Sequence, residues 1–350
     1  PRPTRVRSSA ASDVYKRQGQ TIDILGGVLA ANSDAALGNA LNTVTLNADG
    51  LAAVGFRATD SFTTGRTFIL NQTNNSFEVV RDEVLTLTAP FNLAGNANRA
   101  LGKTYAGVLA ITANNTGWTG PITLTGGILR LGHNNAAGSG AITASPNNWR
   151  GTGVELFNNV NVANALSLQG GDNVFFGGTD FSGQLSSFSG DNTYSGPITF
   201  AFDAAIGARA GSTLRVTGGI TNTTTARTFG INVDATGLVI IDGTPFAANT
   251  GITQLNSLRK HGAGVLSIRN VNTVAIEATN NWFHLKGGRT VLEEAGTWAT
   301  KIFIDKTSSL WLDDRSFNLP LGPHPTANGR LSVNSANARE VAFRGGELLM

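Results

Sequence analysis

The amino-acid sequence predicts an all-β protein, a β-solenoid that forms one elongated body. Three observations lead to this fold class: apolar and polar residues alternate over short segments, glycine and asparagine bound these segments, and short motifs recur along the chain. Alternation is the pattern of a half-buried strand, and many short strands between turn residues are typical of a sandwich, a barrel or a solenoid. The recurring motifs favour the solenoid, because its rungs bury their apolar faces by stacking on each other.

The predicted strands each place two or three apolar residues on one face. The clearest alternating segments are 44–46, 85–87, 109–111, 214–216, 266–268, 302–304, 310–312 and 331–333. Alternate residues of a strand point to the same face, so the apolar set of each segment belongs to the core. We expect the following residues to be buried: Leu109, Ile111, Leu266, Ile268, Leu310 and Leu312.

Three motifs recur at uneven distances. Gly26-Gly27-Val28-Leu29 comes again at 126–129 and 345–348, and more loosely at 287–292. Segment 101–111 aligns without gaps to 258–268, and the hexapeptide 118–123 matches 194–199. The uneven distances indicate degenerate or interrupted modules, and no Pro/Ser-rich linker divides residues 19–350. We therefore expect one continuous body in which paired glycines allow sharp turns between strands.

The residues of these motifs resemble the autotransporter-associated β-strand repeat. Segment 260–268, KHGAGVLSI, is similar to its opening K-T-G-A-G-T-L-T-L; 191–196, DNTYSG, to its centre A-N-T-Y-T-G; and 126–132, GGILRLG, to its close G-G-T-L-x-L-G. Segment 32–38, NSDAALG, matches the N-x-x-A-L-G that often follows. The resemblance covers most of residues 19–350 and departs at His261 and after Ile268. It implies a right-handed parallel β-helix in the passenger region of a very long secreted or surface-displayed protein.

The first 18 residues do not share this pattern. Residues 8–18, SSAASDVYKRQ, resemble the translation of a sequencing-library adapter, so we expect residues 1–18 to lie outside the fold. They hold five basic residues and one acidic residue. The whole chain has 26 Lys and Arg against 23 Asp and Glu, which leaves 21 against 22, a net charge of −1, for residues 19–350. Residues 19–350, the predicted solenoid truncated at both ends, have no clustered basic face for nucleic acid.

The sequence predicts no cofactor. The chain has no cysteine, which excludes disulfides and thiolate metal sites. Gly102-Lys103-Thr104 looks like the tail of a phosphate-binding loop, but that loop needs glycine at position 97, where alanine stands. His261 and His284 are about one rung apart, yet the four histidines lack metal-ligand spacing. No segment approaches the roughly 20 apolar residues of a membrane helix, so no membrane insertion is expected.

These patterns favour a structural and adhesive segment of a large bacterial protein, without catalysis. We expect it outside the cell or displayed at the outer membrane surface. The first alternative is a carbohydrate-active β-helix enzyme, a polysaccharide lyase or glycosidase, which needs acidic groups that converge in one groove. The acidic pairs at 293–294 and 313–314 form no such dyad, since adjacent strand residues point to opposite faces. The remaining candidates are scattered beside turn residues: Asp180, Asp203, Asp234 and Asp242.

A second alternative is an ice- or mineral-binding solenoid. Such a protein needs a flat ladder of outward threonines at a fixed period. Thr-x-Thr pairs occur at 43–45 and 86–88, but they do not recur regularly along the chain. The position of the polar side chains on the rungs decides between the three functions: an acidic groove favours the enzyme, a flat threonine array favours ice, and neither favours the scaffold.

Aromatic residues supply one candidate binding site. Because branched residues claim the core face of 302–304 and 310–312, Phe303 and Trp311 point outward, and the same parity in 282–285 points Trp282 outward. Exposed aromatic patches mark interaction sites, and flat rings suit the apolar faces of sugars. This predicts a glycan-binding stripe of Trp282, Phe303 and Trp311, with glycans or surface polymers as partners; the alternative is that loops cover the rings. End-to-end self-association is also expected, because an uncapped rung edge recruits other chains.

Overall fold

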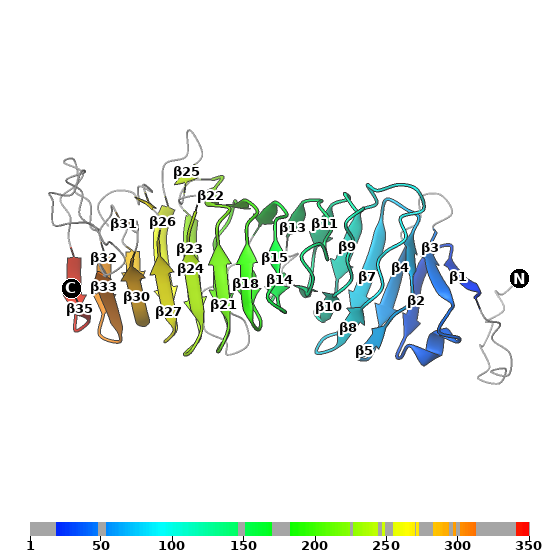
Figure 1. Cartoon of the computed structure of the whole chain (residues 1–350), viewed down its shortest axis with the longest axis horizontal. Helices are drawn as coiled ribbons and strands as arrows, with labels where there is room; N and C mark the ends of the chain where they lie inside the picture. Colours follow the sequence, from blue (N-terminus) through cyan, green and yellow to red (C-terminus); the bar gives the residue numbers. More distant parts are fainter. Residues whose placement is uncertain are drawn as a thin grey trace, which may run out of the picture.

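The computed structural model describes twelve stretches of the chain. They are residues 19–47, 54–145, 151–169, 183–224, 227–243, 247–248, 255–269, 271–272, 283–293, 297–298, 302–312 and 341–349. Residues 1–18, which we expect to lie outside the fold, are not among them. The strands lie side by side along one long axis, with β1 and β35 near opposite ends (Figure 1). This arrangement is the predicted all-β, parallel β-solenoid.

The longest sheet has 12 strands and runs most of the length of the body. In spatial order it contains β5 (Phe62–Thr64), β8 (Val84–Leu87), β10 (Val108–Ile111), β12 (Ile128–Leu131), β14 (Gly153–Leu156), β17 (Leu185–Ser187), β20 (Ala204–Ala208), β23 (Arg227–Val233), β26 (Leu255–His261), β29 (Phe283–Leu285), β32 (Ile302–Asp305) and β34 (Val341–Arg344).

A ten-stranded sheet forms the second face. It contains β2 (Gly27–Ala31), β4 (Val54–Ala58), β7 (Asn75–Val79), β9 (Leu101–Thr104), β11 (Ile122–Leu124), β13 (Ile142–Ala144), β16 (Leu166–Leu168), β19 (Ile198–Phe200), β22 (Ile220–Asn222) and β25 (Ala247–Ala248).

The third face is formed by different sheets at the two ends. An eight-stranded sheet contains β15 (Asn161–Val162), β18 (Asp191–Tyr194), β21 (Thr213–Val216), β24 (Leu238–Ile241), β27 (Val265–Ile268), β30 (Gly288–Leu292), β33 (Ser308–Leu312) and β35 (Glu347–Leu349). Near the N-terminus a three-stranded sheet contains β1 (Thr21–Ile24), β3 (Thr43–Leu46) and β6 (Phe68–Leu70). A two-stranded sheet contains β28 (Val271–Asn272) and β31 (Thr297–Trp298), and one 3-10 helix spans Ala35–Leu37.

Consecutive strands of the chain belong to different faces. From β14 to β25 the path runs from the 12-stranded sheet to the eight-stranded sheet and then to the ten-stranded sheet, as in β20, β21 and β22. Each strand pairs in parallel with its counterpart one turn later, for example β20 with β23 and β21 with β24. Hydrogen bonds between strands therefore join residues distant in sequence. No helix in the described stretches is long and apolar enough to cross a membrane.

The core is the continuous inner column of apolar side chains that alternation predicted. Five of the six expected residues are buried, namely Leu109, Ile111, Leu266, Ile268 and Leu310. The expectation was wrong for Leu312, which is half-buried. Leu312 ends β33, and the next strand, β35, ends opposite Trp311, so no described strand residue stacks over it.

Ser267 points away from the core, between the buried residues Leu266 and Ile268, yet it is only 2% exposed. Its hydroxyl donates to Glu293 and accepts a hydrogen bond from Nε of Arg269 at 3.2 Å. Burial on this face therefore comes from neighbouring polar side chains and differs from burial in the core.

The repeated segments 101–111 and 258–268 each place a lysine inside the body. Lys103 in β9 and Lys260 in β26 are both fully buried. Nζ of Lys103 donates to the carbonyl oxygens of Thr104 and Tyr105, both at 2.7 Å, and of Gly126 at 3.1 Å. Burial lowers the pKa of Lys103 to about 7. The three carbonyl acceptors act in the opposite direction, because they favour the ammonium form.

Lys260 repeats this arrangement at another corner of the solenoid. Its Nζ donates to the carbonyl oxygens of Gly262 at 2.5 Å, Gly264 at 2.6 Å and Gly287 at 2.7 Å. Gly287 belongs to a paired-glycine turn one rung further on, so the ammonium group joins two stacked turns. A Cβ atom on Gly288 would lie 2.6 Å from this Nζ. This contact explains why the lysine motif and the paired glycines recur together in the sequence.

Candidate functional site

The predicted aromatic stripe is divided between two faces of the solenoid. Phe303 lies in β32 of the 12-stranded sheet, whereas Trp311 lies in β33 of the eight-stranded sheet. Both side chains point outward, as their parity predicted, and both are half-buried. Trp282 lies outside the described residues. The structure therefore does not bring Phe303 and Trp311 together on one sheet.

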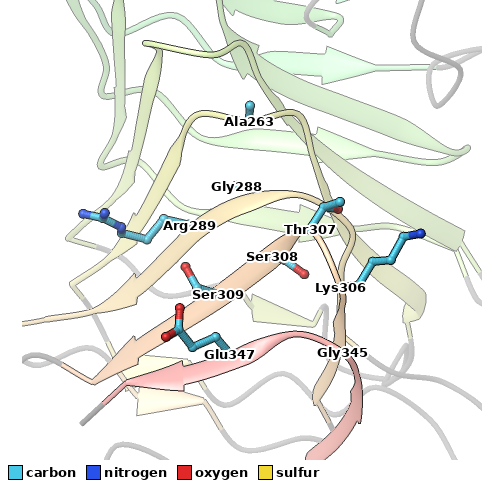
Figure 2. A pocket seen from close by; sticks show the side chains of 9 residues that line it. All are labelled: Ala263, Gly288, Arg289, Lys306, Thr307, Ser308, Ser309, Gly345 and Glu347. Atoms are coloured by element: carbon cyan, nitrogen blue, oxygen red, sulfur yellow. The ribbon is translucent and has the colours of Figure 1, made fainter.

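Trp311 lies beside an open pocket of about 490 Å³. The guanidinium carbon of Arg289 is 3.8 Å from the centroid of the Trp311 ring, and Arg289 also lines the pocket. Figure 2 shows Arg289, Ser309 and Glu347 on adjacent strands, with Lys306 on the turn that precedes β33. Two cations, one carboxylate and several hydroxyls therefore surround a polar hollow at the corner between two sheets.

This pocket can bind a small polar group by hydrogen bonds and charge. The hydroxyl oxygen of Ser308 lies 2.6 and 2.7 Å from the carbonyl oxygens of Leu285 and Asp305, and its single hydrogen is shared between these two acceptors instead of facing the pocket. Arg289 covers a face of the Trp311 indole, so the ring is less available for stacking on a sugar. Nε1 of Trp311 is buried and has no hydrogen-bond partner among the described residues.

Phe303 is also covered by its neighbours. Its ring lies 5.4 Å from the imidazole of His284, centroid to centroid, and the guanidinium carbon of Arg344 lies 4.8 Å from its centroid. A cation over an aromatic face stabilises the surface modestly, by roughly 0.5–1 kcal/mol when exposed. The ring is therefore partly covered, but by side chains of the adjacent strands β29 and β34 and not by the loops that the alternative expected.

The described acidic side chains do not converge in a groove. Glu155 is 1% exposed and accepts hydrogen bonds from Arg130 Nε at 2.8 Å and from Arg209 at 2.6 Å. The guanidinium carbons of these arginines lie 3.7 and 4.9 Å from the ring centroid of Phe188. A buried carboxylate held between two arginines has no position against a substrate, so we assign it a structural role.

Two further described carboxylates also form ion pairs. Asp242 pairs with Arg215 at 2.6 Å, and Glu293 pairs with Arg269 at 3.0 Å. Ile268, the residue before Arg269, pairs with Ile241 on one side and with Leu292 on the other. Arg269 therefore lies between Asp242 and Glu293 in the stack. Asp180, Glu294, Asp313 and Asp314 lie outside the described residues. The described carboxylates thus offer no pair facing a common cleft.

The histidines do not form a metal site in the described residues. His284 pairs in register with Arg259, whereas His261 follows two residues later along β26. Burial lowers the pKa of His261 to about 4, and the nearby cations Lys286 and Arg259 add to this effect. No group of three or more His, Asp or Glu side chains in the described stretches could hold a metal ion.

A row of hydroxyl side chains on the outer face of the ten-stranded sheet was not predicted from the sequence. The signal was present in the matching hexapeptides 118–123 and 194–199, which both end in Gly-Pro-Ile-Thr. Looser copies of that pattern, Gly140-Ala-Ile-Thr and Gly218-Gly-Ile-Thr, occupy intervening or following rungs. Each final threonine points outward at the same position of its strand.

No family model, curated protein sequence or solved structure matches this chain.

Proposed function

We propose that this chain is a structural and adhesive segment of a large secreted or surface-displayed bacterial protein, without a catalytic role. The observation that supports this most directly is the stacking of parallel strands, rung on rung, along one body in the described stretches. A 12-stranded sheet at about 4.8 Å per strand gives a body on the order of 50 Å long. Resemblance of its motifs to passenger repeats supports the same role.

The stacked rungs suit a role in which the protein spans a distance and resists bending. Each rung is joined to the next by backbone hydrogen bonds and, at two corners, by a buried ammonium group. The end strands β34 and β35 each have one edge without a described partner strand, so end-to-end association of such bodies belongs to the same proposal.

The enzyme alternative can be tested with the purified chain. We expect no new reducing or unsaturated ends when it is incubated with a panel of plant, algal and bacterial polysaccharides. Small-angle scattering on the same sample should give the profile of a rod. Cleavage that is lost on substitution of an acidic residue, or a compact scattering profile, would contradict the structural role.

The adhesive part of the proposal is tested by a glycan array. If the predicted aromatic stripe binds sugars, a combined Trp282→Ala, Phe303→Ala and Trp311→Ala variant should lose binding. Phe202→Ala is the matched control, because Phe202 is 49% exposed and contacts Arg227 elsewhere on the body. Binding that survives the triple substitution with the fold intact would show that these rings are not the site.

A further inference from the structure

The ten-stranded sheet has a row of hydroxyl side chains on its outer face. Thr123 of β11 pairs with Thr143 of β13, and the row continues through Ser167 of β16, Thr199 of β19 and Thr221 of β22. The residues directly before and after each of these five are buried, so the five point outward. The pairing has no register shift, and the hydroxyls therefore repeat at the strand spacing of about 4.8 Å.

Uncharged residues, all but one of them exposed or half-buried, flank this row on both sides. Two residues before each hydroxyl stand Pro121, Ala141, Ala165, Pro197 and Gly219, and two residues after stand Thr125, Ser145, Gln169, Ala201 and Thr223. We call these three rows the hydroxyl array. It has no charged and no aromatic side chain. At about 3.3 Å per residue, adjacent rows are about 7 Å apart, so the array measures roughly 19 by 13 Å.

Three of the five central hydroxyl groups of the array have no partner among the described residues, and the other two, of Ser167 and Thr199, form only long hydrogen bonds. Ser167 accepts one from Nε2 of Gln169 at 3.5 Å. The hydroxyl groups of Thr123, Thr143 and Thr221 make no hydrogen bond to another residue in the described stretches. Thr199 donates only a long hydrogen bond, 3.4 Å, to the carbonyl oxygen of Leu166 in the preceding rung. Thr123 is exposed and the other members of the central row are half-buried, so methyl and hydroxyl groups share the surface.

The composition of the array restricts the partner. Ionic minerals and anionic polymers need charged side chains, and sugars usually stack on aromatic rings; the array has neither. A partner that is neither charged nor a sugar remains, and ordered water is such a partner. Hydroxyls donate to and accept from water, and the methyl and prolyl groups between them are surfaces around which water is restricted in orientation.

The spacing of the array selects the form of that water. Oxygen atoms on the surface of ice repeat at nearly the spacing of strands in a β-sheet, so successive rungs present hydroxyls to successive lattice positions. We propose that the hydroxyl array binds ice. This inference goes beyond the structural role of the chain, and neither one depends on the other.

The experiment measures partition of the full chain into slowly grown polycrystalline ice, against an inert protein of similar size in the same solution. We expect the chain to be enriched in the ice and to facet single ice crystals under the microscope. Thr143→Lys and, separately, Thr199→Lys should abolish both effects, because each places a long charged side chain in the middle of the array. The matched control is Thr213→Lys, at a half-buried outward position of β21 in the eight-stranded sheet.

Each variant is accepted only if its circular dichroism spectrum and melting temperature match those of the unsubstituted chain. Exclusion of the unsubstituted chain from ice, to the same degree as the inert protein, would overturn the proposal. So would ice binding that survives both array substitutions or is lost equally in the control. Retention on crystalline cellulose or chitin with exclusion from ice would assign the array to a polysaccharide surface instead.

Discussion

Replacing Gly127 by alanine tests the close stacking of turns at the lysine corners. Gly127 has φ of +67°, and a Cβ atom there would lie 2.3 Å from the carbonyl oxygens of Gly107 and Tyr105 and 2.8 Å from Nζ of Lys103. Gly211 is a matched control, because its φ is +72° and a Cβ atom there meets nothing within 4 Å. The pair separates the cost of a left-handed backbone from the cost of crowding between rungs.

The expected magnitudes follow from these two contributions. A left-handed conformation costs an alanine roughly 1–2 kcal/mol. Alanine also lowers the conformational entropy of the unfolded chain, which stabilises the folded state by about 0.4–1 kcal/mol. Gly211→Ala should therefore lower the free energy of unfolding by about 0.5–1 kcal/mol. Gly127→Ala adds an overpacking cost of about 1–3 kcal/mol, because stacked backbone carbonyls cannot move apart without lengthening inter-rung hydrogen bonds. Its total should be about 1.5–4 kcal/mol.

The assay is equilibrium denaturation in urea, followed by circular dichroism. Repeat proteins can unfold in parts, so the comparison uses the shift in midpoint, with the slope required to stay constant between variants. Gly288→Ala should rank with Gly127→Ala, because its Cβ would lie 2.4 Å from the Gly264 carbonyl oxygen. If Gly127→Ala and Gly211→Ala destabilise the chain equally, close approach of the turns is not what requires glycine at position 127.

Three further predictions concern stability. Leu266→Ala should cost about 2–5 kcal/mol as a core cavity, and Ser267→Ala about 1 kcal/mol for its hydrogen bonds; equal midpoint shifts in urea would show that the inward and outward assignments are wrong. Burial lowers the pKa of Lys260 from 10.5 to about 7. Between these two pH values the unfolded chain binds more protons than the folded chain. The free energy of unfolding should therefore rise from pH 7 toward 10.5. Lys260→Met should flatten that rise in denaturation curves, and a stability that falls over this interval would refute the pKa direction. Glu155→Gln should cost about 3–5 kcal/mol because it leaves two arginines without their buried carboxylate, whereas Glu78→Gln, in a more exposed pair with Arg57, should cost under about 1 kcal/mol; similar thermal shifts would contradict this ranking.

The sequence by itself determined the fold class and most of the core. Alternation in 109–111 and 266–268 was sufficient to place Leu109, Ile111, Leu266 and Ile268 inside, because strand geometry fixes the side of each residue locally. The recurrence of paired glycines indicated sharp turns between strands, because glycine adopts backbone conformations that other residues avoid. Leu312 was the exception, since its burial depends on the length of a neighbouring strand, which no local pattern contains.

Tertiary structure alone decided which outward residues meet. Phe303 and Trp311 are eight residues apart and share a parity, yet the turn between β32 and β33 assigns them to different faces. The sequence also did not predict the partners of the buried lysine ammonium groups, because Gly126 and Gly287 come from the next rung.

The hydroxyl array shows the physical reason most clearly. Its central residues, Thr123, Thr143, Ser167, Thr199 and Thr221, are separated by 20, 24, 32 and 22 residues, so no fixed period exists in the sequence. In the structure they are neighbours in one row. The segments that connect successive strands of this sheet differ in length, but the strands themselves pair in the same register. Local alternation determines that each threonine points outward, whereas register between strands determines that the threonines form a surface.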